Sequence, residues 1–264
     1  MKTIPLLLLA AATSLQAQFN YTDLPFLARS APPAAGLPLT TNFLVYWGAI
    51  DYGLTNTSNV SPPANGDSVM DWANKVTTQP NWAHALSGRE PLYYSAGGPN
   101  GYGRVSMVTT LRELKAYPTA NIYPQVVTVF AVLRFTGNQG ANSGFVFDST
   151  TAGTRGYCYT ILTGSKVELH LGGPAKEFNG ASSLTTNTWF LLTCQWNSAS
   201  SLMRTNGVTY ATGDAGVSSL TGWSWGEGVG NAGPLYGDFA EVLMYVTNAD
   251  LTATETYLKG KYGL

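Results

Sequence analysis

The stretch GDFAEVLMY, residues 237–245, decides the fold together with the segment that follows it to Leu264. It is apolar and rich in residues that favour strands, so it predicts a closing β-strand. The sequence TATE at 252–255 matches a capping box, in which a hydroxyl and a carboxylate bind the first free backbone N–H groups of a helix. Gly260 and Gly263 are stop signals for that helix. The C-terminal segment therefore predicts a strand, a turn and one short helix.

Upstream of this segment the chain reads as a series of strands. The strongest, VVTVFAVLRF at 126–135, is apolar on both faces, which predicts a central strand covered on both sides. The pair Asn206-Gly207 predicts a tight hairpin. Other strands are predicted at intervals of roughly 8–15 residues, the spacing of an all-β sandwich; they lie at 144–147, 157–162, 166–171, 189–196, 201–204 and 208–210.

The N-terminal residues have the pattern of a secretory signal peptide at 1–17. Lys2 precedes a short apolar run, and Ala17 is the small residue before the expected cleavage point. The run is shorter than the roughly 20 apolar residues that a membrane span needs, and no other stretch predicts a span. The alternative, a buried N-terminal helix, lacks an amphipathic period. We therefore expect a secreted protein, extracellular or at the cell surface, with a proline-rich leader at 18–41 before one domain at 42–264.

The amino-acid composition argues against two classes of binding partner. Charged residues make up 11% of the chain, where about 25% is typical, and the net charge is −1. Ser, Thr, Asn and Gly take the polar positions instead, which suits an extracellular β protein. No basic or acidic block is present, so the sequence argues against nucleic acid or an anionic membrane as a partner.

The two cysteines, Cys158 and Cys194, each lie in an apolar, strand-like run. In an oxidising compartment such a pair is a possible disulfide. The alternative is two buried free thiols on different strands, because a free cysteine packs as a small hydrophobic residue.

Three blocks of sequence carry a family resemblance. The first is GDSVMDW at 66–72 with REPLY at 89–93 and GGPNG at 97–101; the second is NTWFLLT at 187–193 with Leu202 and the Asn-Gly pair; the third is the C-terminal stretch with KYGL at 261–264. In this order they resemble the LamG-like branch of the concanavalin A-like lectin/glucanase superfamily, as found in secreted bacterial proteins. The resemblance implies an antiparallel jelly-roll sandwich of two curved sheets with a short C-terminal helix. It implies no particular reaction, because such folds host many functions.

Two short motifs match catalytic patterns but lack their context. GWSWG at 222–226 fits the nucleophile elbow, yet no helix is predicted after it and both histidines, His84 and His170, lie upstream. GVGNAG at 228–233 fits a dinucleotide-binding loop, yet no helix follows to meet a pyrophosphate. We interpret the glycines as a loop between strands.

Paired carboxylates, the signature of glycan hydrolysis, are not clustered in this sequence. Asp67 and Asp71 lie in a segment that the resemblance treats as scaffold. Asp238 and Glu241 are three residues apart, which predicts opposite faces of a strand. Glu241 is expected to hold the C-terminal connection by hydrogen bonds.

Calcium is the possible cofactor, because many members of the resembled superfamily bind it through Asp, Asn and carbonyl oxygens. Asp148, Asp214 and Asn231 are the loop candidates for such a site.

Aromatic side chains give the remaining candidates for ligand binding. Trp223 and Trp225 project to one side of a strand at i and i+2, and Tyr157 and Tyr159 do the same. A ring face can pack against the C–H face of a sugar while the polar tip makes a hydrogen bond. The alternative is core packing, which we expect for four other tryptophans, Trp47, Trp72, Trp189 and Trp196.

The sequence therefore favours a secreted, non-catalytic binding module for a polysaccharide or another cell-surface glycan. One alternative is a structural or adhesive protein that assembles with other chains, or with itself, through its leader and a sheet edge. The other is a polysaccharide hydrolase or lyase.

Overall fold

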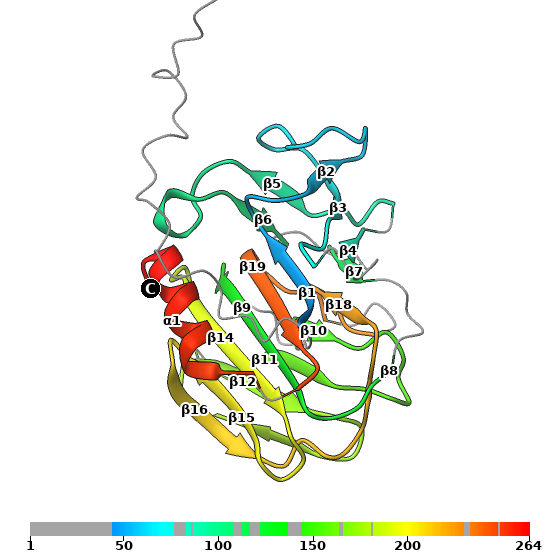
Figure 1. The fold of residues 1–264 in the computed structure, drawn as a ribbon, viewed down its shortest axis with the longest axis vertical. Coiled ribbons are helices and arrows are strands. Elements are labelled where there is room, and N and C mark those ends of the chain that lie inside the picture. The colour runs from blue at the N-terminus through cyan, green and yellow to red at the C-terminus, as the bar shows by residue number, and fades with distance from the viewer. Residues whose placement is uncertain are drawn as a thin grey trace, which may run out of the picture. The chain divides into compact units, whose positions relative to one another are not determined.

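The structure is a computed structural model that describes residues 44–76, 83–85, 87–107, 112–116, 122–136, 144–163, 166–180, 182–229, 233–247 and 249–264 (Figure 1). The predicted signal peptide and leader lie outside these residues. The described chain forms strands throughout and one α-helix, so the predicted all-β sandwich is confirmed. None of the described helices has the length and apolar character of a membrane span.

One sheet of eight strands is built around the two longest strands, β9 and β19. The strand order is β16-β15-β14-β9-β19-β6-β5, and β1 also pairs with β19. All the pairings are antiparallel. The strands are β1 (Leu44–Ala49), β5 (Leu92–Tyr94), β6 (Arg104–Ser106), β9 (Val127–Phe135), β14 (Phe190–Trp196), β15 (Ser201–Thr205), β16 (Val208–Gly213) and β19 (Gly237–Tyr245).

The other large sheet has nine strands, and it carries most of the candidate site. Its order is β13-β12-β11-β10-β18-β7-β4-β3-β2. Its strands are β2 (Leu54–Asn56), β3 (Val69–Trp72), β4 (Ala83–His84), β7 (Leu114–Ala116), β10 (Gly144–Asp148), β11 (Tyr157–Thr163), β12 (Lys166–Gly172), β13 (Glu177–Asn179) and β18 (Trp223–Trp225). Two short strands, β8 (Ile122–Tyr123) and β17 (Leu220–Thr221), pair separately, and a 3-10 turn, η2, spans Pro99–Gly101.

The core lies between the two large sheets. Phe130 of β9 and Phe147 of β10 are fully buried, and the Phe147 ring lies 5.4 Å from that of Trp196 on β14. The two long strands are buried at nearly every position, as the apolar sequence of 126–135 predicts. Of the four tryptophans expected in the core, Trp72 and Trp196 are buried, and Trp47 and Trp189 are partly buried against it.

The Asn206-Gly207 pair forms the predicted hairpin between β15 and β16. Both residues have positive φ, 51° and 83°, which is the conformation that two-residue hairpin turns require.

The C-terminal helix, α1 (Leu251–Tyr262), contacts β14 of the eight-stranded sheet (Figure 1). The predicted capping box is wrong, because the cap is Asp250, whose carboxylate accepts the N–H of Ala253 at 2.9 Å. Glu255, expected to complete the box, instead accepts the hydroxyl of Thr193 at 2.8 Å and so fixes the helix to the sheet. Gly263, in the left-handed conformation, ends the helix as predicted.

Candidate functional site

The outer face of the nine-stranded sheet carries a row of polar side chains. Along β10 and β11 the side chains alternate, so Phe147 and Cys158 point into the core while Asp148 and Tyr157 point outward. Because directly paired residues share a face, the row continues across the sheet from Ser224 through Asp148, Tyr157 and Gly172 to Glu177. The sheet thus gathers residues that are far apart in the sequence.

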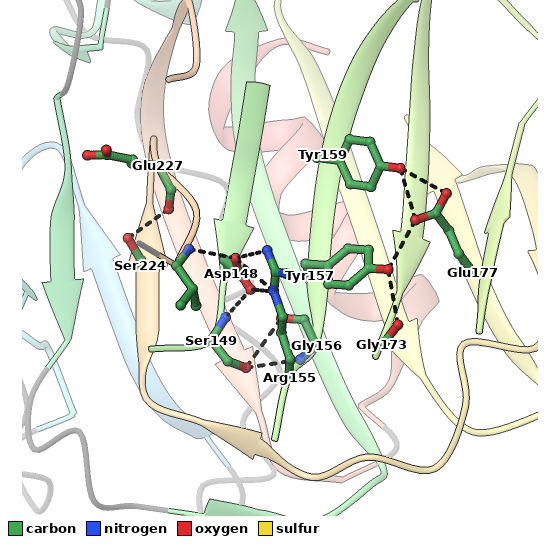
Figure 2. A network of polar contacts seen from close by, with 11 residues as sticks. Asp148, Ser149, Arg155, Gly156, Tyr157, Tyr159, Gly173, Glu177, Ser224 and Glu227 are labelled. Atoms are coloured by element: carbon green, nitrogen blue, oxygen red, sulfur yellow. Dashed lines mark hydrogen bonds and ion pairs between the residues drawn. The ribbon is translucent and has the colours of Figure 1, made fainter. Parts of the chain in front are cut away.

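Four side chains on this face form what we call the Tyr–His–Glu cluster: Tyr157, Tyr159, His170 and Glu177. Figure 2 shows Tyr157, Tyr159 and Glu177. Glu177 accepts the Tyr159 hydroxyl at 2.8 Å and the Tyr157 hydroxyl at 3.1 Å. Its Oε1 lies 2.9 Å from Nδ1 of His170. Two phenols and an imidazole therefore converge on one carboxylate, whose side chain remains 33% exposed.

Gly172 allows the side chains of Tyr157 and Glu177 to approach each other. It pairs with both Tyr157 and Glu177, and a Cβ on it would lie only 3.0 Å from the Tyr157 hydroxyl and from the Glu177 Cβ. Lacking a side chain, it leaves room for the tyrosine to reach the carboxylate across the intervening strand.

The rings of the cluster pack into a continuous aromatic surface. Tyr159 stacks on His170 with centroids 4.9 Å apart and planes 19° apart. Tyr157 and Phe145 lie 5.6 and 5.3 Å from Tyr159. Burial, reinforced by the neighbouring Glu177 carboxylate, raises the pKa of Tyr157 to about 12, and the pKa of Tyr159 is raised as well. Both phenols stay protonated at neutral pH and can donate hydrogen bonds.

An ion pair borders the cluster. The Arg155 guanidinium lies over the ring of Tyr157 at 4.8 Å and over that of Phe145 at 5.2 Å. It also binds Asp148 through two nitrogens, Nε at 2.8 Å and Nη2 at 2.6 Å. The buried Asp148 carboxylate accepts a further N–H from Val229 at 2.9 Å, and burial raises its pKa. The charge of Arg155 is therefore already balanced.

The predicted calcium ligands have other partners. Asp148 is neutralised by Arg155, and Asp214 is paired with Lys176, so neither carboxylate is available as predicted. Asn231 lies outside the described residues. Within the described part of the chain no three His, Cys, Asp or Glu side chains group as a metal site.

Two carboxylates outside the cluster, Glu113 and Glu227, lie beside β7 and β18. Both side chains are fully buried. Arg89 Nη1 lies 3.6 Å from Glu113 Oε1 and 3.1 Å from Glu227 Oε2, and Lys115 Nζ lies 2.8 Å from Glu113 Oε2. Burial, followed by repulsion from Glu113, raises the pKa of Glu227 to about 7. The two residues are far apart along the chain, so no local motif in the sequence predicts the pair.

The prediction that Trp223 and Trp225 form a binding surface is wrong. Both are 3% exposed, because β18 turns them toward the core. Trp223 packs against Phe147 and Trp196, and Trp225 lies 4.8 Å from Tyr46.

The glycine-rich motifs have structural explanations. Ser224, at the centre of GWSWG, is buried and donates its hydroxyl to the carbonyl of Glu227 at 2.9 Å. Gly228 approaches the ring of Phe145 so closely that a Cβ would lie 2.6 Å from it. This glycine therefore lets the loop after β18 cross the outer face of the sheet.

Asp238 and Glu241 lie on the same face of β19, contrary to the prediction. A register shift between Phe239 and Glu241 marks a bulge, and a bulge adds a residue that reverses the expected alternation. Asp238 is paired with Arg134 at 2.7 Å. Glu241 holds the C-terminal helix, as expected, by accepting from Lys261 Nζ at 2.8 Å.

Cys158 and Cys194 are free thiols in the structure, and both are fully buried. They lie on β11 and β14, in different sheets, and they contact each other within the core. Burial, together with the adjacent Cys158, raises the pKa of the Cys194 thiol. The structure therefore agrees with the second alternative, two buried free thiols on different strands.

Comparison with known proteins identifies the fold. No family model matches the chain, and no curated protein matches its sequence. A GH54 α-L-arabinofuranosidase soaked with 4-nitrophenyl α-L-arabinofuranoside is 13% identical with a TM-score of 0.62, over 83% of this chain and 63% of that one. The binding domain of botulinum neurotoxin serotype D is 10% identical with a TM-score of 0.54, over 82% of this chain and 51% of that one.

A third similar structure is Trypanosoma rangeli sialidase in complex with 2,3-difluoro-KDN. It is 14% identical with a TM-score of 0.51, and the match covers 87% of this chain and 35% of the sialidase. The chain therefore spans less than two thirds of the length of each of these proteins. At such identities the likeness shows the fold alone, a β-sandwich.

Proposed function

We propose that this protein is a secreted module, LamG-like in type, that binds a glycan on the outer face of its nine-stranded sheet. The observation that carries the proposal is the Tyr–His–Glu cluster. It combines partly exposed aromatic rings with hydroxyl, imidazole and carboxylate groups on one surface. Ring faces pack against sugar C–H groups, and the polar tips bind sugar hydroxyls.

Two further observations support a glycan as the ligand. The cluster is held by strand pairing and by its own hydrogen bonds, so little conformational entropy is lost when a ligand binds. Among the structures of similar fold is the same neurotoxin ligand-binding domain in complex with N-acetylneuraminic acid, at 11% identity and a TM-score of 0.54. A sugar-binding role is thus compatible with the fold.

The proposal is tested by a glycan array and by polysaccharide affinity electrophoresis. We expect the wild-type protein to be retarded by at least one polysaccharide, and Tyr157→Ala and Tyr159→Ala to lose the retardation. Tyr52→Ala is the matched control, because Tyr52 is 41% exposed and is not part of the cluster. No binding to any glycan, or equal binding by all three variants, would contradict the proposal.

A second candidate function, glycoside hydrolysis, is favoured by Glu227. A carboxyl group with a pKa near 7 beside a second carboxylate is suited to general-acid catalysis. The Glu227 side chain is fully buried, so this role requires that the segments covering it open to admit a substrate. If the protein is a hydrolase, it releases nitrophenol from 4-nitrophenyl glycosides, and Glu227→Gln lowers the rate by about 10²–10⁴-fold. A rate that Glu227→Gln leaves unchanged argues against this role.

A further inference from the structure

The charge on the outer face is unevenly distributed. The two cations beside the cluster are already paired, Arg155 with Asp148 and Lys176 with Asp214. Glu177, in contrast, is bound by the two phenols and the imidazole of His170, and no described lysine or arginine pairs with it. The cluster therefore contains a carboxylate that no described lysine or arginine balances.

A second carboxylate adds to this charge. Glu168 pairs with Ile161, two residues along β12 from His170, so its side chain is on the same face as the cluster. It is partly exposed, and no described cationic side chain pairs with it. An acidic sugar would meet repulsion from both carboxylates, whereas a cationic group would be attracted to both.

Glu177 has room for one more donor. A carboxylate has about four lone-pair sites. The single Tyr159 proton is shared between its two oxygens, at 2.8 and 2.9 Å, and the Tyr157 proton is divided between Glu177 and the carbonyl of Gly173 at 3.0 Å. At most three donors therefore fill the four sites, and the Glu177 side chain is 33% exposed.

Aromatic rings around a carboxylate are a suitable environment for an ammonium group. The faces of electron-rich rings attract cations, and a carboxylate accepts a charge-assisted hydrogen bond from them. We propose that the Tyr–His–Glu cluster binds a glycan that carries a protonated amino group, which Glu177 accepts while Tyr157 and Tyr159 contact the sugar ring. This inference rests on the proposed glycan-binding function and specifies its ligand class.

The test compares three soluble oligosaccharides by isothermal titration calorimetry: chitosan oligosaccharides, which carry amines; chitin oligosaccharides, their neutral N-acetylated counterparts; and oligogalacturonates, which carry carboxylates. We expect chitosan to bind at least about tenfold more tightly than chitin, because a hydrogen bond between charged groups is worth more than a neutral one. We expect oligogalacturonates not to bind. Added salt should weaken chitosan binding more than chitin binding.

Variants of Glu177 identify the group responsible. Glu177→Gln keeps the shape and removes the charge, so we expect the preference for chitosan to fall about tenfold or more. Glu177→Asp retains the charge and should retain the preference. Lys176→Ala is the matched control, because Lys176 is the exposed neighbour whose partner is Asp214. Thermal unfolding of each variant shows whether it is folded before its binding is compared.

The outcomes separate this inference from the proposed function. Equal binding of chitosan and chitin, or a preference unchanged in Glu177→Gln, overturns the amino-sugar inference while glycan binding stands. Preferential binding of oligogalacturonates overturns it as well. Binding to none of the three also overturns it, and the glycan array then decides whether the proposed function survives.

Discussion

Glu227 is the residue whose titration should be visible in the stability of the protein. Burial and the adjacent Glu113 raise its pKa from 4.5 to about 7 in the folded state. Between those values the folded protein binds more protons than the unfolded chain, so the free energy of unfolding falls as the pH rises through this window. The full effect is up to about 3 kcal/mol.

The measurement is urea unfolding at a series of pH values across the window. Glu227→Gln is neutral at every pH, so we expect its free energy of unfolding to lack this fall with rising pH. Glu177→Gln, a change in a partly exposed carboxylate, should keep it. Parallel pH profiles for the wild type and Glu227→Gln would show that Glu227 titrates normally.

At the residue scale the sequence predicted half of the Tyr–His–Glu cluster. The i, i+2 spacing of Tyr157 and Tyr159 correctly placed both rings on one side of a strand. The same spacing misplaced Trp223 and Trp225, because periodicity shows that two side chains share a face but not which face meets the core. Glu177 could not be predicted, since it reaches the tyrosines only through the pairing of β13 with β12.

At the element scale, the buried tryptophans of β18 should contribute strongly to the stability of the fold. Because Trp223 is buried against Phe147 and Trp196, Trp223→Ala should lower the free energy of unfolding by about 3–5 kcal/mol. Tyr52→Ala, at an exposed site, should change it by less than about 0.5 kcal/mol. Urea unfolding monitored by circular dichroism measures both. A small effect of Trp223→Ala would mean that the ring is not in the core.

The start of α1 offers a test of helix capping. Asp250 accepts the N–H of Ala253, so Asp250→Ala should destabilise the protein by about 1 kcal/mol. Thr252→Ala should cost less, because Thr252 lies inside the helix and its side chain is exposed. Thermal unfolding of the two variants distinguishes the cap in the structure from the capping box in the sequence. A larger loss in Thr252→Ala would favour the box.

The capping box was predicted wrongly because Glu255 makes long-range contacts that the local sequence does not show. A box requires Glu255 to turn back to the helix start, but Thr193 Oγ1 and Arg204 Nη2, at 2.8 and 3.0 Å, hold its carboxylate against the sheet. Long-range contacts of this kind override a local pattern. Strands with strong apolar patterns, such as β9 and β19, were predicted well, because a run of β-branched and aromatic residues indicates a buried strand whichever strands it pairs with.

At the scale of the whole molecule, the reactivity of the two cysteines measures whether the two sheets have separated. Cys158 belongs to the nine-stranded sheet and Cys194 to the eight-stranded one, and the two thiols meet in the core between them. Neither thiol has any exposed surface. An alkylating reagent can therefore reach them only when the sheets separate, which exposes both thiols together.

We expect no alkylation of the native protein and two alkylated cysteines after denaturation, counted by intact mass without reductant. Along a urea gradient, both should become reactive at the same midpoint as the loss of β-structure, because opening the sandwich at either cysteine exposes its partner. Early labelling of one cysteine alone would show that one sheet edge opens independently. A denatured protein that takes up no label until it is reduced would instead contain a disulfide between the sheets. The sandwich would then be covalently closed across its core.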